Sequence, residues 1–157
     1  DATTGFELNR LTLLARGAKD EDIVTFRYAD AGLKLYGNSV IASSKFISEN
    51  PRALTAFLRA SNRALIDTIS NPEEAIKANK VFDSLIDEAI ELEKLKITLR
   101  SINTDFARSN GLGAVQKRDL ETQVDDVAMA FQLKAKPNPD LIFNSSFLPP
   151  RSERIPR

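Results

Sequence analysis

The chain contains neither cysteine nor histidine among its 157 residues. Without cysteine it can form no disulfide, no cysteine-ligated metal site and no thiol nucleophile. Without histidine it lacks imidazole metal ligands, the Ser-His-Asp triad and the commonest general base. We therefore expect no catalytic residue, no metal site and no cofactor, and the sequence argues against an enzyme.

A net charge and long apolar runs are absent as well. Lysine and arginine together number 22, as do aspartate and glutamate, so no overall field attracts nucleic acid or an anionic membrane. No apolar run approaches the roughly 20 residues that a membrane-spanning helix needs. With 42% hydrophobic residues the chain can still bury a core. Its expected partners are small molecules or other proteins.

The first forty residues change from a helical to a β-rich pattern. Apolar residues recur at helical spacing over residues 6–16, and Gly17 can end that helix in a left-handed conformation. Residues 23–28 and 33–42 are rich in β-branched and aromatic side chains, which predicts two strands. Gly37 marks a bulge or a close backbone approach in the second. We therefore predict an α/β fold with few strands.

The rest of the sequence predicts helices with clear start signals. These are Ser43 or Ser44 as a capping residue, and the pairs Asn50-Pro51 and Asn71-Pro72, which place proline at a first helical position. Further helices are expected at residues 83–100, at 104–110 with Gly111 as the stop, and at 116–133. Residues 149–157 are expected to fray.

Four segments, in this order, carry a resemblance to a known family. They are DATTGF at residues 1–6, LYGNSVIASSKFISENPRALTAFLRASNRAL at 35–65, NGLGAV at 110–115 and IFNSSFLPP at 142–150. The second resembles the signature of periplasmic solute-binding proteins of ABC importers, in the nitrate, sulfonate, taurine and thiamine-pyrimidine branch. The other three resemble that family's cleft segment, a late helical region and the closing segment.

The resemblance implies a partial type II periplasmic-binding-protein-like lobe with a predominantly helical C-terminal part. In that family two α/β lobes, joined by crossover strands, close on a ligand by a hinge motion. Residues 1–28 would end the second lobe, 29–38 would cross the hinge, and 39–157 would complete the first lobe. The chain would then be a fragment, the C-terminal half, without the signal sequence and half of the pocket. Such a half exposes lobe-facing apolar surface, which predicts self-association.

Thr4, Gly5, Phe6 and Glu7 form the first candidate ligand-binding group. Ligands of open α/β sheets bind beyond the carboxyl ends of strands, where helix N-termini offer free N–H groups. Glu7 could bind an amino-bearing ring such as an aminopyrimidine, and it would repel a sulfonate or nitrate. The other interpretation is an ordinary helix start, with a capping threonine and a glutamate that suits the helix dipole.

Tyr28, Asp30, Tyr36 and Asn38 form the second candidate group. A tyrosine can stack on a flat ligand while its hydroxyl forms a hydrogen bond. Aspartate and asparagine can fix the orientation of such a ligand. The same residues equally suit a hinge, with Asp30 in a turn and Asn38 in a bulge.

Two other sets of charged residues have simpler interpretations. Carboxylate runs such as Asp20–Asp22 are interleaved with lysine and arginine and are expected to be solvated faces. Arg151, Arg154 and Arg157 could touch an acidic partner, but a disordered end of the chain is the simpler expectation.

Three functions are consistent with these observations. The resemblance implies an extracytoplasmic, periplasmic protein that captures a small organic solute, such as a thiamine-pyrimidine precursor or a sulfonate- or nitrate-like ligand, and delivers it to an ABC permease. The first alternative is a thiamine-pyrimidine synthase-like enzyme on the same fold. Those relatives use a histidine and a cysteine-rich loop, and this chain has neither residue type. The second alternative is a helical protein-interaction module, which would not need the predicted strand pair.

Overall fold

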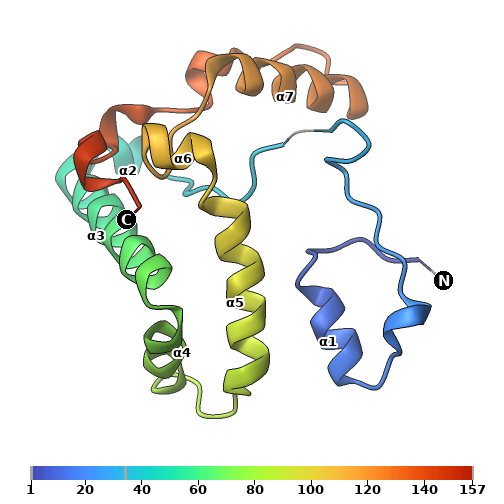
Figure 1. The fold of residues 1–157 in the computed structure, drawn as a ribbon. Coiled ribbons are helices and arrows are strands. Elements are labelled where there is room, and N and C mark those ends of the chain that lie inside the picture. Colours follow the sequence, from blue (N-terminus) through green and yellow to red (C-terminus); the bar gives the residue numbers. More distant parts are fainter. Residues whose placement is uncertain (1, 34, 157) are drawn as a thin grey trace. The chain divides into compact units, whose positions relative to one another are not determined.

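The computed structural model describes residues 2–33 and 35–156. Asp1, Lys34 and Arg157 lie outside the described residues, so nothing further is said of Arg157. Helices dominate the described part (Figure 1). The α-helices are α1 (Asn9–Ala15), α2 (Ser44–Glu49), α3 (Pro51–Ser70), α4 (Pro72–Lys80), α5 (Glu88–Ile102), α6 (Asp105–Asn110) and α7 (Lys117–Ala130). Short 3-10 turns are η1 (Asp20–Asp22), η2 (Pro139–Leu141), η3 (Ser145–Phe147) and η4 (Arg151–Glu153).

The predicted starts of α2, α3 and α4 are confirmed. Ser43 caps α2, because its Oγ accepts a hydrogen bond from the Phe46 N–H at 3.1 Å. α3 and α4 both begin at the proline of an Asn-Pro pair. The missing N–H of proline costs nothing there, since the first N–H groups of a helix have no intrahelical acceptor.

Gly17 ends α1 as predicted. Its φ is +94°, in the left-handed region that glycine adopts without strain. Its N–H donates to Leu14 O at 2.9 Å, and the next N–H, from Ala18, donates to Leu13 O at 3.1 Å. This pair of bonds is the Schellman arrangement, which satisfies carbonyl groups left over at the end of a helix.

The start of α5 differs from the sequence prediction by five residues. The helix begins at Glu88 rather than Asp83, after Asp87, whose Oδ1 accepts from the Ala89 and Ile90 N–H groups. Asp83 forms its own local turn instead, with Oδ1 accepting from the Leu85 N–H at 3.1 Å. Aspartate readily makes such side chain–backbone bonds, which compete with the helix and delay its start.

The two predicted strands are not formed. Residues 23–27 and 35–43 belong to neither a helix nor a strand, and no strand occurs within residues 2–33 and 35–156. Ile23 has extended backbone, with φ −107° and ψ 110°. An extended segment becomes a strand only when the backbone of a neighbouring extended segment pairs with it, and no such strand pairing occurs among the described residues. The helical C-terminal part is thus confirmed, whereas the α/β lobe is not.

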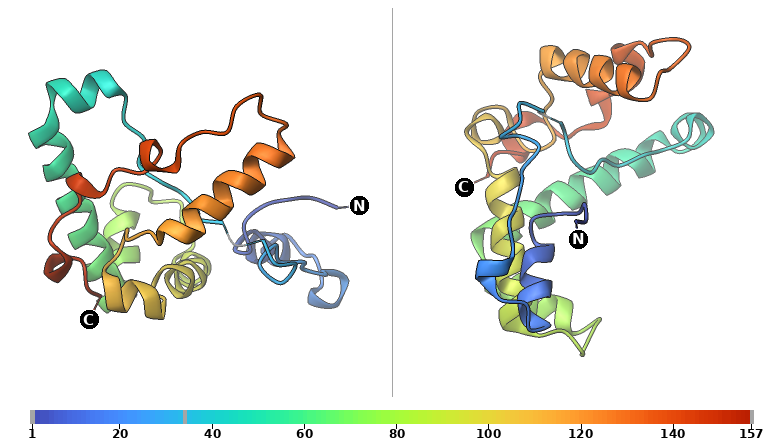
Figure 2. Two further views of the ribbon diagram at one scale, coloured as in Figure 1. Left: turned by 90° about the horizontal axis from the view of Figure 1, so that it is seen from above. Right: turned by 90° about the vertical axis from the view of Figure 1, so that its right-hand side faces the viewer.

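The chain divides into two units, each described here by itself. The first contains residues 1–25, 62–112 and 151–157. In it α4 and α5 form a helical hairpin, and α1 contacts α5 (Figures 1 and 2). Ile76, Ala107 and Leu112 are its buried apolar side chains. This small buried set indicates a thin core.

The end of the chain packs onto this first unit, which corrects the expectation that residues 149–157 fray. Arg154 is only 8% exposed, and its Nη1 donates to Leu112 O at 2.6 Å. In return, the Leu112 N–H donates to Arg154 O at 2.8 Å. Arg151 donates from Nε to Ser109 O at 2.8 Å. The arginines therefore satisfy carbonyl groups at and just beyond the end of α6, where the helix itself leaves acceptors unused.

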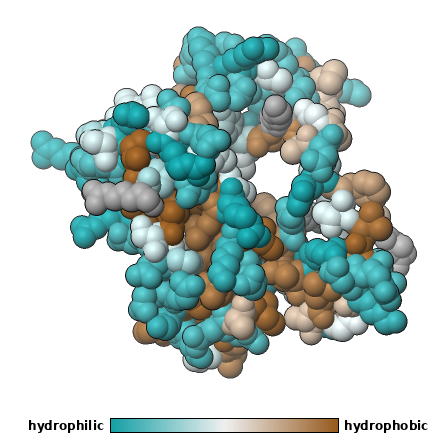
Figure 3. Space-filling model, viewed as in Figure 1, coloured by the Kyte–Doolittle hydropathy of each residue, from teal (hydrophilic) through white to brown (hydrophobic). Residues whose placement is uncertain are grey.

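The second unit contains residues 26–61 and 113–150. Leu54 and Val124 are its buried apolar side chains, and α7 contacts η2. Many large apolar side chains remain in solvent, with Phe26 90% and Ile41 93% exposed. Apolar residues also reach the surface on the face drawn in Figure 3. In the described part of the chain, no helix combines the length and apolar character that crossing a bilayer requires.

Candidate functional site

The first candidate group, Thr4 to Glu7, lies ahead of α1 and is exposed. Thr4 does not cap that helix: the N-cap is Leu8, which offers no side-chain hydrogen bond. The carbonyl oxygens of Phe6 and Glu7 instead accept from the N–H groups of the first helical residues. A Cβ at Gly5 would lie 2.6 Å from Asn9 Nδ2, so the backbone passes close to a side chain there.

Tyr28 and Asp30 share one tight turn in the second unit. The Ala31 N–H donates to Tyr28 O at 3.2 Å, and the Leu33 N–H donates to the same oxygen at 3.0 Å. Gly32 closes the turn with a φ of +90°. Both candidate side chains are exposed, and Tyr28 keeps 61% of its surface in solvent. They are therefore accessible to a ligand.

Tyr36 is held against α7 by two hydrogen bonds. Its hydroxyl oxygen accepts from the Gln116 N–H at 2.8 Å, and its own N–H donates to Gln123 Oε1 at 2.9 Å. Gln116 is the N-cap residue of α7 and makes no side-chain cap of its own. Tyr36 is half-buried, whereas Asn38 is exposed. The structure thus gives Tyr36 a packing role that the sequence did not reveal.

The sequence gives only a weak indication that Gln116 and Gln123 contact Tyr36. Gln116 and Gln123 lie seven residues apart, so they share one face of a helix. Two amides on one face indicate a polar contact, but they do not identify a partner 80 or more residues away.

The hollow found on the described part of the chain does not include the candidate residues. A shallow hollow of about 300 Å³ occurs on α3, where its lining residues are Pro51, Arg52, Thr55, Ala56 and Arg59. None of these belongs to the two candidate groups. Across residues 2–33 and 35–156, no cluster of three carboxylate, histidine or cysteine side chains could hold a metal ion.

The carboxylate runs are paired on the surface, as expected of solvated faces. Asp20 binds Arg10 at 2.5 Å, and Glu74 binds Lys77 at 2.7 Å. The hydrogen bond and charge of Glu74 raise the pKa of Lys77. By contrast, burial lowers the pKa of Arg154, and the positive charge of Arg151 lowers it further.

Replacing Tyr36 by phenylalanine is expected to lower the free energy of unfolding by about 0.5–1.5 kcal/mol, the usual worth of one hydrogen bond. The Gln116 N–H loses its acceptor, and the first turn of α7 should exchange its amide hydrogens faster. Urea unfolding followed by circular dichroism measures the first effect. Tyr28→Phe is the matched control, because the Tyr28 hydroxyl bonds to no other described residue. Equal losses in the two variants would contradict the assigned role of Tyr36.

Comparison with known proteins places the chain in a class. Residues 1–75 match the family described as NMT1/THI5 like. This match confirms the resemblance seen in the sequence: residues 1–75 are similar to the NMT1/THI5-like, ABC-type solute-binding proteins.

An alignment with a curated protein gives a more specific comparison. The chain is 29% identical over 119 residues to the riboflavin-binding protein RibY of Chloroflexus aurantiacus. The aligned region covers 73% of this chain and 34% of the relative, so the chain spans about a third of that protein's length. No solved structure matches the chain.

Proposed function

We propose that this chain is part of a solute-binding component of an ABC importer, which captures a small organic solute outside the cytoplasm and passes it to a membrane permease. The observation that carries the proposal is the family match over residues 1–75, extended by the relative that aligns over 119 residues. The absence of histidine and cysteine supports binding over catalysis, because the synthase-like relatives use those residue types.

The ligand we propose is a flat nitrogen heterocycle, such as riboflavin or a thiamine-pyrimidine precursor, rather than a sulfonate, taurine or nitrate. The relative RibY is named as a riboflavin-binding protein, which supports a flavin as the ligand. Two tyrosines, Tyr28 and Tyr36, supply flat aromatic faces, and aromatic stacking suits a planar ring better than a small anion. Tyr28 is the better stacking residue of the two, since the Tyr36 hydroxyl already accepts a hydrogen bond.

The lobe assignment is also a proposal. Residues 1–28 would end one lobe, 29–38 would cross the hinge, and 39–157 would complete the other lobe. The turn at Tyr28–Gly32 and the irregular segment 35–43 supply backbone that can change its dihedral angles without breaking a helix. We propose that the group Thr4 to Glu7 and the group Tyr28, Asp30, Tyr36 and Asn38 each contact the ligand.

The test is calorimetry on the complete product of the gene with four probes: riboflavin, an aminopyrimidine, taurine and nitrate. Binding of riboflavin or the aminopyrimidine, with weak or no binding of the two anions, is the expected result. Tyr28→Ala should then weaken the bound heterocycle about tenfold, the scale of one lost aromatic contact. Tight binding of an anion alone would overturn the ligand class, and binding of none of the four would overturn the proposed function.

Glu7→Gln provides a prediction about selectivity. The change removes one negative charge and keeps the size of the side chain. We expect the aminopyrimidine to bind less tightly, while the affinity for nitrate or taurine is unchanged or improved, because a carboxylate attracts an amino group and repels an anion. Glu21→Gln, a neutralised carboxylate on η1, is the control and should change neither affinity. Equal losses for the amino-bearing and the anionic probe would remove Glu7 as a selectivity residue.

A further inference from the structure

The connection between α4 and α5 displays three large apolar side chains to solvent. Val81 is 82% exposed, Phe82 89% and Leu85 93%. We call these three residues the α4–α5 tip. Single exposed apolar residues are ordinary on protein surfaces, but neighbouring ones mark sites of interaction.

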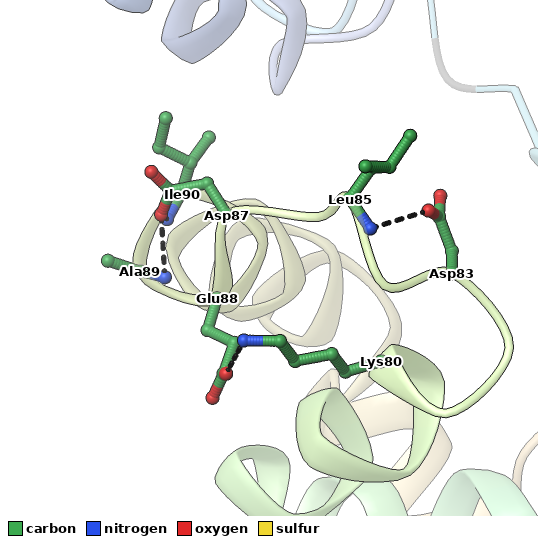
Figure 4. Close-up of polar contacts among 7 residues, drawn as sticks. All are labelled: Lys80, Asp83, Leu85, Asp87, Glu88, Ala89 and Ile90. Atoms are coloured by element: carbon green, nitrogen blue, oxygen red, sulfur yellow. Dashed lines mark hydrogen bonds and ion pairs between the residues drawn. The ribbon is translucent and has the colours of Figure 1, made fainter.

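The tip is held in shape by its own hydrogen bonds, so its exposure does not result from a loose connection. The N–H groups of Phe82 and Asp83 donate to Asn79 O at 2.9 and 3.0 Å. Asp83 accepts from the Leu85 N–H, and Lys80 pairs with Glu88 across the base of the connection (Figure 4). A preformed apolar surface loses little conformational entropy when a partner covers it.

The surroundings of the tip are acidic. Asp83 lies between Phe82 and Leu85, and Asp87 follows two residues after Leu85. Both carboxylates accept backbone hydrogen bonds. Lys80 is paired with Glu88, so it does not compensate them. An anionic lipid surface is therefore a poor partner for the tip, and an apolar site with a basic rim is a good one.

The chain itself carries such a site, on the first turns of α3. The hollow of about 300 Å³ has Pro51, Thr55 and Ala56 in its lining. The Thr55 hydroxyl donates to Pro51 O at 3.1 Å, which leaves its methyl group for apolar contact. Arg52 and Arg59 line the same hollow and supply positive charge. Its volume lies at the low end of ligand pockets, so it suits one or two side chains better than a whole ligand.

We propose that the α4–α5 tip of one copy of this chain docks into the α3 hollow of a second copy. Phe82 enters the hollow, and Asp83 and Asp87 meet Arg52 and Arg59. Apolar burial supplies the affinity, and the opposite charges select the register. The two surfaces differ, so the contact is heterologous. A pair of chains leaves one tip and one hollow unused, and further copies can bind to them.

Analytical ultracentrifugation over a range of concentrations tests the proposal. The wild-type chain is expected to associate, and Phe82→Ser and Arg59→Glu should each raise the dissociation constant about tenfold or more. Phe26→Ser is the matched control: Phe26 is 90% exposed, yet it belongs to neither surface, so its loss should leave association unchanged. Circular dichroism verifies that every variant is folded.

Mixing the two defective variants separates a heterologous contact from general stickiness. Phe82→Ser keeps its hollow and Arg59→Glu keeps its tip, so together they should form a one-to-one pair that grows no further. A variant that carries both Asp83→Arg and Arg59→Asp should again associate with other copies of itself, because the two charges are exchanged. A wild-type chain that stays monomeric at its solubility limit, or an equal loss with Phe26→Ser, would overturn the proposal. So would Phe82-dependent flotation with neutral phosphatidylcholine vesicles in place of association, since the tip would then belong to a lipid surface.

Discussion

Replacing Gly111 by alanine is expected to destabilise the first unit by about 2–4 kcal/mol. The backbone at Gly111 has a φ of +90°, which an L side chain rarely adopts. A new Cβ would also lie 2.9 Å from Arg154 Nη1 and 3.0 Å from Arg154 Cβ. The guanidinium could swing aside, but the Cβ of Arg154 can move only with its backbone. Urea unfolding followed by the helical circular dichroism signal measures the loss.

Gly32 provides the control for this prediction. It has the same φ of +90°, but nothing lies within 4 Å of the position of its Cβ. Gly32→Ala should therefore cost only the backbone strain, about 1–2 kcal/mol. The difference between the two variants measures the crowding by Arg154. If Gly111→Ala costs no more than Gly32→Ala, the close approach of the C-terminal residues to α6 is wrong.

Replacing Arg154 by alanine is the second large effect, expected to lower the free energy of unfolding by about 2–4 kcal/mol. Arg154 is 8% exposed, and its guanidinium donates to Leu112 O at 2.6 Å. Its removal leaves that carbonyl without its charged donor and leaves a gap where the side chain packed. Urea unfolding measures the change. Amide exchange at Leu112 should also speed up, because its N–H donates to Arg154 O.

Arg151→Ala is the control, because it removes a nearby arginine that is exposed. Arg151 bonds Ser109 O, so a loss below about 1 kcal/mol is expected. Part of even that loss should be offset, because the positive charge of Arg151 opposes the charged form of Arg154. Arg154→Lys should recover only part of the lost stability, since an ammonium group lacks the planar guanidinium fork. Equal effects at Arg151 and Arg154 would contradict the importance of burial.

The two substitutions also test each other, because Gly111 and Arg154 are in contact. In a chain that already carries Arg154→Ala, the Cβ at position 154 remains but the guanidinium is gone, so Gly111→Ala should cost less than it does beside Arg154. The double variant is therefore expected to be more stable than the sum of the two single losses predicts. Simple additivity would show that Gly111 and Arg154 act independently.

The parts of the fold that could be predicted from sequence are those that local chemistry decides. Ser43 caps α2 with its own hydroxyl, and Gly17 ends α1 with its own positive φ. The prolines that start α3 and α4 need only the residues beside them. The start of α5 was missed by five residues, because an Asx turn at Asp83 competes with the helix.

The sequence could predict candidate ligand residues, but not how their side chains lie relative to one another. Tyr36 was chosen for its aromatic ring, and the structure shows it bonded to α7 through Gln116 and Gln123. Thr4 was interpreted as a possible helix cap, and the helix begins later, after Leu8. A residue type restricts the chemistry that is available, whereas a site also needs the distances between side chains.

By itself, the sequence determined where most helices begin and end, the absence of histidine and cysteine chemistry, and the resemblance to a family of solute-binding proteins. These depend on residue identity and on neighbours within a few positions. Only the tertiary structure decided that residues 23–27 and 35–43 do not form strands, and that Arg154 is buried beside Leu112, 42 residues away. Strand pairing and arginine burial both require partners from distant parts of a chain, and the free energy of such contacts depends on where the backbone brings them together.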